Sequence, residues 1–190
     1  VLDYLDTHSA DLIVLATSQA DGRASWLRRS ISEPVARKAG QATLFVPAGT
    51  PGFVSLQDGT VTLRSIVIPI AAQPRPEAAV AAAVRLARQL ECPSGTFTLL
   101  HVGSAASAPA VKAPALPGWQ CKRVTRSGDV IDEIVGAARD AQAGLIVMST
   151  DGRSGFLDAL RGSHSERVLR AAPCPVLAIP EGSFAARALR

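Results

Sequence analysis

Four small residues before a predicted helix are the part of this sequence best suited to bind a ligand. Gly152, Gly155, Gly162 and Ser163 lie between two short apolar runs. A glycine loop that enters a helix leaves backbone N–H groups free at the positive end of the helix dipole, where anions such as phosphates bind. The loop therefore predicts an anion site. Arg153 can add positive charge to it, although an ordinary exposed loop arginine is the simpler interpretation.

The same loop also has a purely structural interpretation. Glycines turn the chain tightly in many α/β folds. Ser163 and Glu166 have the S-x-x-E spacing of a capping box, in which the serine only caps the helix. On spacing alone, the anion site and the simple turn are supported about equally.

Neither catalysis nor a metal site is predicted. The sequence has no G-x4-G-K-[ST] motif, and Asp151 and His164 are the only candidates for proton transfer near the loop. Cys92, Cys121 and Cys174 are widely separated and show no C-x2-C spacing. We therefore expect free thiols in a reducing compartment rather than metal ligands.

The glycine loop is expected to be held by a parallel sheet. An apolar run at residues 145–148 precedes it, and another at residues 176–179 follows the helix, which Pro173 and Pro175 end. Further strands are predicted at residues 65–70, 97–102 and 120–125, and helices at residues 77–90 and after Asp129. His101, inside one of these strands, is interpreted as structural, and residues 103–118 are expected to form a mobile loop or lid. The alternation of strands and helices predicts an α/β fold.

The chain repeats part of itself. Residues 11–17 (DLIVLAT) resemble residues 144–150 (GLIVMST), and residues 44–47 (LFVP) resemble residues 177–180 (LAIP). Each segment lies 133 residues before its counterpart, as expected for two copies of one domain. Most of the loop glycines are absent from the first copy, so we expect it to keep the fold without the anion site.

Four segments follow from the repeat. Residues 1–47 are predicted to be the second half of a first copy, residues 48–63 a linker, residues 64–180 a complete second copy and residues 181–190 a tail. The first half of the first copy is expected before Val1, in a longer parent chain. Packing of the half-copy against a partner is the alternative.

The loop and the strand after it resemble a known family. Gly152 is followed after nine residues by Gly162 and Ser163, and residues 174–177 read CPVL. These motifs are similar to the universal stress protein domain, which has G-x2-G-x9-G-[ST] after its fourth strand and a fifth strand like CPVLV. Ser149 stands at the first glycine of that pattern.

The resemblance implies a five-stranded parallel sheet of order 3-2-1-4-5 with helices on both faces, preceded by the second half of a like domain. It also implies a small cytoplasmic regulatory protein of the stress response, not an enzyme, in a family of which some members bind ATP. Those members carry an Asp after the first strand, where this sequence has Ala71. The nucleotide-binding positions implied here are Pro69, Ile70, Ala71, Met148, Gly152, Arg153, Gly155, Gly162, Ser163, His164 and Ser165.

Two functions therefore stay open. In the first, the second copy binds ATP or another adenine nucleotide as part of a regulator. In the second, the protein is a dimerisation or partner-binding module without nucleotide. Because family members pair through their fifth strands, residues 176–179 and 44–46 would then pair as a pseudo-dimer of tandem copies, with a homodimer as a further partner arrangement. An enzyme is a third and less supported interpretation.

Composition excludes several other classes. Hydrophobic residues make up 47% of the 190 residues and charged residues 19%, which is typical of a globular protein rather than a disordered one. The net charge is +4, but the basic residues are scattered and not interleaved with aromatic residues, so no nucleic-acid partner is predicted. No apolar run approaches the roughly 18 residues of a membrane helix, so no membrane partner is predicted.

Overall fold

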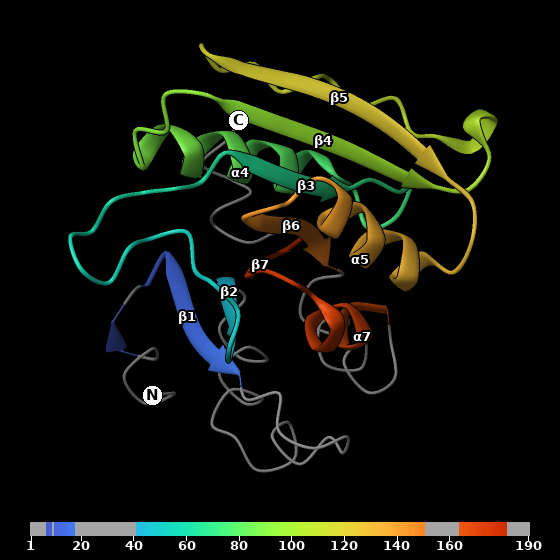
Figure 1. Ribbon diagram of the computed structural model, residues 1–190. Coiled ribbons are helices and arrows are strands. Elements are labelled where there is room, and N and C mark those ends of the chain that lie inside the picture. The colour runs from blue at the N-terminus through green and yellow to red at the C-terminus, as the bar shows by residue number, and fades with distance from the viewer. Residues whose placement is uncertain (1–6, 9, 18–40, 151–163, 182–190) are drawn as a thin grey trace.

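The computed structural model describes residues 7–8, 10–17, 41–150 and 164–181, which are drawn in colour in Figure 1. Within these residues the strands are β1 Leu12–Thr17, β2 Ala42–Pro47, β3 Ser65–Pro69, β4 Gly95–Val102, β5 Trp119–Arg126, β6 Leu145–Thr150 and β7 Val176–Pro180. The α-helices there are α4 Glu77–Gln89, α5 Val130–Asp140 and α7 His164–Ala171, and Ala105–Ser107 forms a 3-10 turn. The strands and helices expected in these ranges are present, with small differences at their ends.

A seven-stranded sheet runs through the molecule in the order β1-β2-β7-β6-β3-β4-β5 (Figure 1). The strands from β7 to β5 are mutually parallel and have the order expected for the second copy. The sheet is nevertheless larger than the five strands expected, because β1 and β2 extend it. β2 pairs antiparallel with β7, and β1 pairs parallel with β2. The predicted pairing of residues 44–46 with residues 176–179 is therefore present within one chain.

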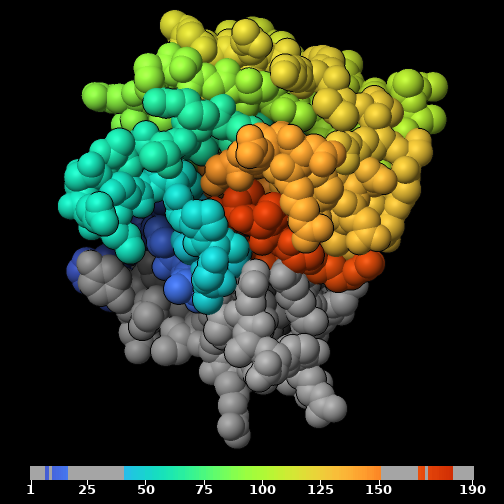
Figure 2. Space-filling view, viewed as in Figure 1, coloured from blue at the N-terminus to red at the C-terminus, as the bar shows by residue number. Residues whose placement is uncertain are grey.

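Two hydrophobic cores lie on opposite faces of the sheet, because successive residues of a strand point to opposite sides. On one face α5 and α7 cover buried residues such as Phe45, Val67 and Ile146. On the other face α4 covers residues such as Ile66 and Val147. Figure 2 shows the side of α5 and α7, where the yellow-orange surface of α5 adjoins the red surface of α7. The predicted helices on both faces are thus confirmed.

The alanine content of α4 explains how that helix packs on the sheet. Ala79, Ala83 and Ala87 recur every four residues, so they form one stripe along the helix, and each has 0% of its surface exposed. Small side chains in this stripe let the helix backbone approach the strands closely. Alanine also has the highest intrinsic helix propensity, so the same residues favour the helix before it packs.

The loop at residues 103–118 packs on the sheet instead of standing free as the expected lid. Val111 is buried in the core on the α4 side. The Arg123 guanidinium donates a hydrogen bond to the backbone carbonyl of Val111. The sequence missed this because Val111 is a single apolar residue in a stretch with no period, and only its place above β5 gives it a core to enter.

Residues 48–63, predicted to be a linker, fold into a short hairpin that contributes to the core. Val54 and Val61 form an isolated antiparallel bridge. At the tip, Gly59 adopts a φ of +73°, in agreement with the Asp-Gly turn signal in the sequence. Phe53 and Leu63 are buried on the α4 side of the sheet, with 8% and 0% of their surfaces exposed. The segment therefore packs as well as connects.

β1 and β2 share the geometry of β6 and β7. Both pairs are parallel, with Val14 opposite Leu44 in one pair and Val147 opposite Leu177 in the other. The two registers differ by the 133 residues that separate the sequence repeats. This agreement supports the interpretation of β1 and β2 as an earlier copy of β6 and β7, which stays a prediction.

Candidate functional site

The strand order reverses between β3 and β6, and in parallel sheets ligands bind at the carboxyl ends of strands where this happens. The chain continues from β3 to α4 on one face of the sheet, and α7 follows β6 on the other face. β3 and β6 pair in parallel, with Ile66 opposite Leu145 and Val67 opposite Ile146. Residues 69–71 and 148–150 therefore lie together at the carboxyl ends of the parallel strands, as the sequence predicted.

At its carboxyl end, β6 carries two hydroxyl groups that have no hydrogen-bond partner among the described residues, those of Ser149 and Thr150. Ser149 is 7% exposed and Thr150 is 3% exposed. Since residues alternate along a strand, Ser149 shares the α4 side with Val147, and Thr150 shares the opposite side with Met148. An unpaired buried hydroxyl costs about 1–3 kcal/mol. Each hydroxyl is therefore a candidate group for hydrogen bonding to a ligand.

The side chain of His101 lies beside the carboxyl end of β3. Its imidazole is buried, with Nδ1 3.3 Å from the carbonyl oxygen of Ile70 and Nε2 3.0 Å from the Oγ of Ser107. A carbonyl only accepts hydrogen bonds, so Nδ1 is the donor in the first contact. Both contacts hold the 103–118 loop against the end of β3, which confirms the structural role expected of His101. The contact of Nδ1 also occupies the Ile70 carbonyl group at the candidate site.

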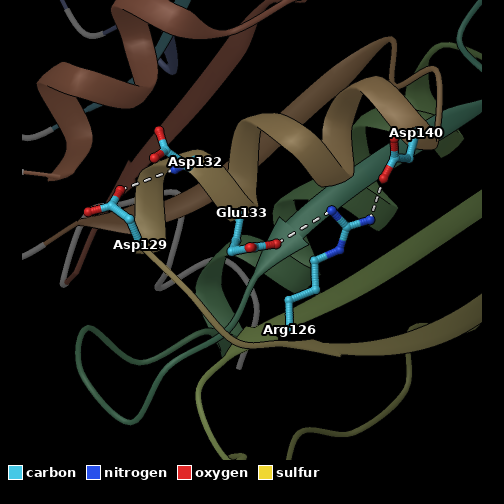
Figure 3. Close-up of polar contacts among 5 residues, drawn as sticks. All are labelled: Arg126, Asp129, Asp132, Glu133 and Asp140. Atoms are coloured by element: carbon cyan, nitrogen blue, oxygen red, sulfur yellow. Dashed lines mark hydrogen bonds and ion pairs between the residues drawn. The ribbon is translucent and has the colours of Figure 1, made fainter.

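The helices that begin at the carboxyl ends of the strands differ in their suitability for an anion. α5 is already capped, since the Asp129 carboxylate accepts hydrogen bonds from the N–H groups of Ile131 and Asp132 at 3.0 and 3.2 Å. Figure 3 shows the contact with Asp132. Asp132 and Glu133 add negative charge to its first turn. α4 has no side-chain cap, although Glu77 lies in its first turn. Phosphate is therefore disfavoured at α5, which leaves the N-termini of α4 and α7.

The charged residues around α5 neutralise one another. The Arg126 guanidinium lies 2.6 Å from the Asp140 carboxylate and 3.6 Å from that of Glu133 (Figure 3). The hydrogen bond that the Arg126 guanidinium donates to the Asp140 carboxylate is the main reason why the pKa of Arg126 is raised. Arg167 of α7 lies 3.7 Å from the Asp129 carboxylate. These contacts join β5 to α5 and α5 to α7, so we assign them a structural role.

The structure describes only part of the predicted nucleotide-binding set. Pro69 and Ile70 lie at the end of β3 and are half-buried and buried, whereas Ala71 is exposed. Met148 lies in β6, and its side chain is buried in the core beneath α5 and α7. His164 and Ser165 begin α7, but their side chains are outside the described part of the chain. Asp151, Gly152, Arg153, Gly155, Gly162 and Ser163, and the Glu166 side chain of the capping box, also lie outside the described residues.

Sequence reasoning missed the hydroxyls of Ser149 and Thr150. It treated Ser149 only as a departure from the glycine pattern and gave Thr150 no role. A signal was nevertheless present, because the apolar run at residues 145–148 ends in two adjacent hydroxyl residues. Buried polar groups in strands normally have partners.

The described residues contain no group of three or more His, Cys, Asp or Glu side chains placed to hold a metal ion. None of the helices in the same ranges is long and apolar enough to cross a membrane. Cys92, Cys121 and Cys174 are free thiols, of which Cys121 is half-buried and the others are buried. Burial raises the pKa of all three thiols, and that of Cys174 to about 12. They are therefore protonated and poorly nucleophilic at neutral pH.

Comparison with known proteins agrees with this architecture. The sequence profile of the universal stress protein family matches residues 108–180, which run from the loop before β5 to the end of β7. This part of the chain belongs to the universal stress protein family. A universal stress protein from Methanocaldococcus jannaschii is 48% identical over 48 residues, which are 25% of this chain and 28% of that relative.

Solved structures show the same fold over a longer stretch. A universal stress protein from Archaeoglobus fulgidus matches with a TM-score of 0.66 and 18% identity, over 93% of this chain and 63% of that one. A functionally unknown protein from Pseudomonas aeruginosa matches with a TM-score of 0.59 and 12% identity, over 98% and 68%. The chain thus spans less than two thirds of the Archaeoglobus protein and about a quarter of the Methanocaldococcus relative.

Proposed function

We propose that this protein is a non-enzymatic regulator of the stress response that binds an adenine nucleotide where β3 and β6 diverge. The observation that carries the proposal is the pair of buried hydroxyls, Ser149 and Thr150, that lack partners among the described residues. The reversal of strand order at the same point supports it. Membership of residues 108–180 in the universal stress protein family is consistent with such a role.

The nucleotide would contact both faces of β6 at its carboxyl end. Thr150 faces the side on which α7 lies, so its hydroxyl would bind a phosphate beside the N-terminus of that helix. The backbone N–H groups of residues 152–155 and 162–165 are proposed to bind the other phosphate oxygens. Ser149, on the α4 side, would bind the sugar or the base.

Calorimetric titration of the intact protein with ATP tests this function. We expect one saturable site per chain, and binding about tenfold weaker in Thr150→Val, which loses one hydrogen bond to the phosphate. Thr43→Val is the matched control. Thr43 is a buried strand threonine on β2, two strands from β6, and its hydroxyl donates to the Gln41 carbonyl at 3.3 Å. Absence of saturable binding would reject the proposal.

A partner-binding module without nucleotide is the second candidate. It is favoured by the exposed Ala71, which stands where nucleotide-binding members have Asp, and by the contact of His101 with the Ile70 carbonyl. Because β7 already pairs with β2 inside the chain, the fifth-strand contact of a dimer would be internal here. This function predicts that ATP produces no heat of binding and no change in mass by light scattering. Saturable binding of ATP would exclude it.

We further propose that residues 1–47 and residues 64–180 derive from two copies of one domain, with residues 48–63 between them and residues 181–190 as a tail. The shared register of the two parallel strand pairs supports this division. The proposed location is the cytoplasm, since free thiols persist in reducing compartments. The proposed partners are the nucleotide and the second copy, without nucleic acid or membrane.

A further inference from the structure

Arg167 of α7 is held less firmly than the other ion-paired arginine near α5. Its Nη2 atom lies 3.7 Å from Oδ1 of Asp129, which is too far for a hydrogen bond. The same oxygen already accepts hydrogen bonds from two backbone N–H groups at the start of α5. Arg126, by contrast, donates a hydrogen bond of 2.6 Å to the Asp140 carboxylate. Arg167 therefore joins α7 to α5 by an ion pair, but among the described residues its guanidinium has no hydrogen bond.

The position of Arg167 in its helix also favours an anion nearby. It is the fourth residue of α7, His164–Ala171. Side chains on a helix lean toward its N-terminus, so the guanidinium is directed toward the first turn. Positive charge is unfavourable at this end of the helix dipole, whereas an anion is favoured there. Asp129 supplies a negative charge, but Arg167 and Asp129 are 54% and 43% exposed, and an exposed ion pair contributes little.

A second polar group on this side of the sheet lacks a partner among the described residues. β6 and β7 are parallel, so the helix between them begins toward the carboxyl ends of these strands, where Thr150 lies. The Thr150 side chain shares a face with Met148, whose core α5 and α7 cover. It is 3% exposed, and its hydroxyl has no described partner. A buried hydroxyl and an exposed guanidinium therefore lie on one face of the sheet, both toward the carboxyl ends of its strands.

We propose that Arg167 determines the specificity of the nucleotide site for di- and triphosphates, and that it exchanges Asp129 for the outer phosphates of the ligand. Thr150 is buried and Arg167 is exposed, so a phosphate chain that begins at Thr150 runs outward to Arg167. A guanidinium donates two parallel hydrogen bonds to phosphate, and such charge-assisted bonds are roughly twice as strong as neutral ones. The Asp129 oxygen near Arg167 is already shared by two N–H groups, whereas a phosphate offers free oxygens and more charge. This inference rests on the proposed nucleotide function and adds what selects the length of the phosphate chain.

Calorimetric titration of the intact protein with ATP and with AMP tests this role. Arg167→Gln should bind ATP about tenfold more weakly, because it loses the charge-assisted hydrogen bonds, and should bind AMP nearly as the unsubstituted protein does. Arg139→Gln is the matched control, since it removes the same charge at the last turn of the neighbouring helix α5. If both variants bound ATP with equal affinity, net charge alone would explain the effect and the proposal would be overturned.

Two further variants test the exchange with Asp129. Asp129→Asn retains a capping side chain for α5 but removes the competing charge, so it should bind ATP up to about fivefold more tightly, the equivalent of an exposed ion pair. Asp132→Asn removes the same charge from the same end of α5 and should have a smaller effect. In the Arg167→Gln background, the two substitutions should have equal effects. An advantage of Asp129→Asn that persisted without Arg167 would mean that Asp129 repels the ligand directly, and the exchange would be wrong.

Inorganic triphosphate distinguishes failure of this inference from failure of the nucleotide function. If ATP binds but Arg167→Gln leaves the ratio of ATP to AMP affinity unchanged, the role of Arg167 is rejected and the nucleotide function stands. If inorganic triphosphate binds as tightly as ATP and Arg167→Gln weakens both, Arg167 binds phosphate but the adenine function is rejected. If neither ligand binds, both are rejected.

Discussion

Thr150→Val is expected to stabilise the protein in the absence of ligand. Thr150 is 3% exposed, and its hydroxyl has no hydrogen-bond partner among the described residues. In the unfolded chain the same hydroxyl is hydrogen-bonded to water, so folding removes that bond, and the described residues supply no other in its place. Valine has nearly the shape of threonine but no polar group, so the substitution removes this cost from the folded state.

The magnitude follows from comparison with a second buried threonine. Thr43 is 2% exposed, and its hydroxyl donates to the Gln41 carbonyl at 3.3 Å. Removal of an unpaired buried hydroxyl should recover about 1–3 kcal/mol, whereas removal of a paired one should lose about 0.5–1.5 kcal/mol. The extra methyl group contributes similarly in both variants and cancels in the difference. Thr150→Val should therefore be more stable than Thr43→Val by at least about 1.5 kcal/mol.

Urea unfolding followed by circular dichroism measures this difference at 25 °C without nucleotide. Each kcal/mol corresponds to a shift of about 2–4 °C in Tm for a chain of this size, so thermal unfolding gives an independent reading. If Thr150→Val were as destabilised as Thr43→Val, the Thr150 hydroxyl would have a partner in the folded protein. The Thr150 hydroxyl would then not be a free group for binding a ligand, whatever the outcome of the ATP titration.

Three further predictions follow from other parts of the structure. Asp129→Ala removes the cap of α5 and should lower the free energy of unfolding in urea by about 1 kcal/mol, whereas Asp129→Asn should retain most of it. Burial raises the pKa of Cys174 to about 12 from 9.0, so the folded state keeps its proton longer than the unfolded state. Stability should therefore fall by up to about 1.4 kcal/mol per pH unit above pH 9, and Cys174→Ala should flatten that slope in urea titrations at several pH values. Gly118→Ala should lower Tm by several degrees, because φ there is +78° and a Cβ atom would collide with the Pro93 carbonyl; an unchanged Tm would show that this turn can rearrange.

Much of the fold could be predicted because its signals are local. A short apolar run such as residues 145–148 must be buried on both sides, and the cap at Asp129 marks the start of a helix without any tertiary information. The repeat of residues 11–17 at residues 144–150 is likewise a property of the sequence. The parallel sheet, its helices on both faces and the pairing of β2 with β7 all follow from such signals together with the family resemblance, whereas the antiparallel direction of that pairing comes from the structure.

The candidate site was predicted less completely, because its character depends on contacts between distant segments. No local pattern shows that the Ser149 and Thr150 hydroxyls are buried without partners, since that depends on what β3, β7 and the helices place around them. The contact between His101 and the Ile70 carbonyl, 31 residues apart in sequence, is of the same kind.

The amino-acid sequence by itself determined which segments of this protein are strands and helices, and its internal repeat predicts that two of the strand pairs are copies. Secondary-structure propensity, hydrophobic periodicity and helix-end signals act over a few residues, so they can be recognised in the sequence alone. Only the tertiary structure decided that Val14 is exposed while its counterpart Val147 is fully buried. The two valines stand in nearly the same local sequence, and their difference arises because a helix from elsewhere in the chain covers one and not the other.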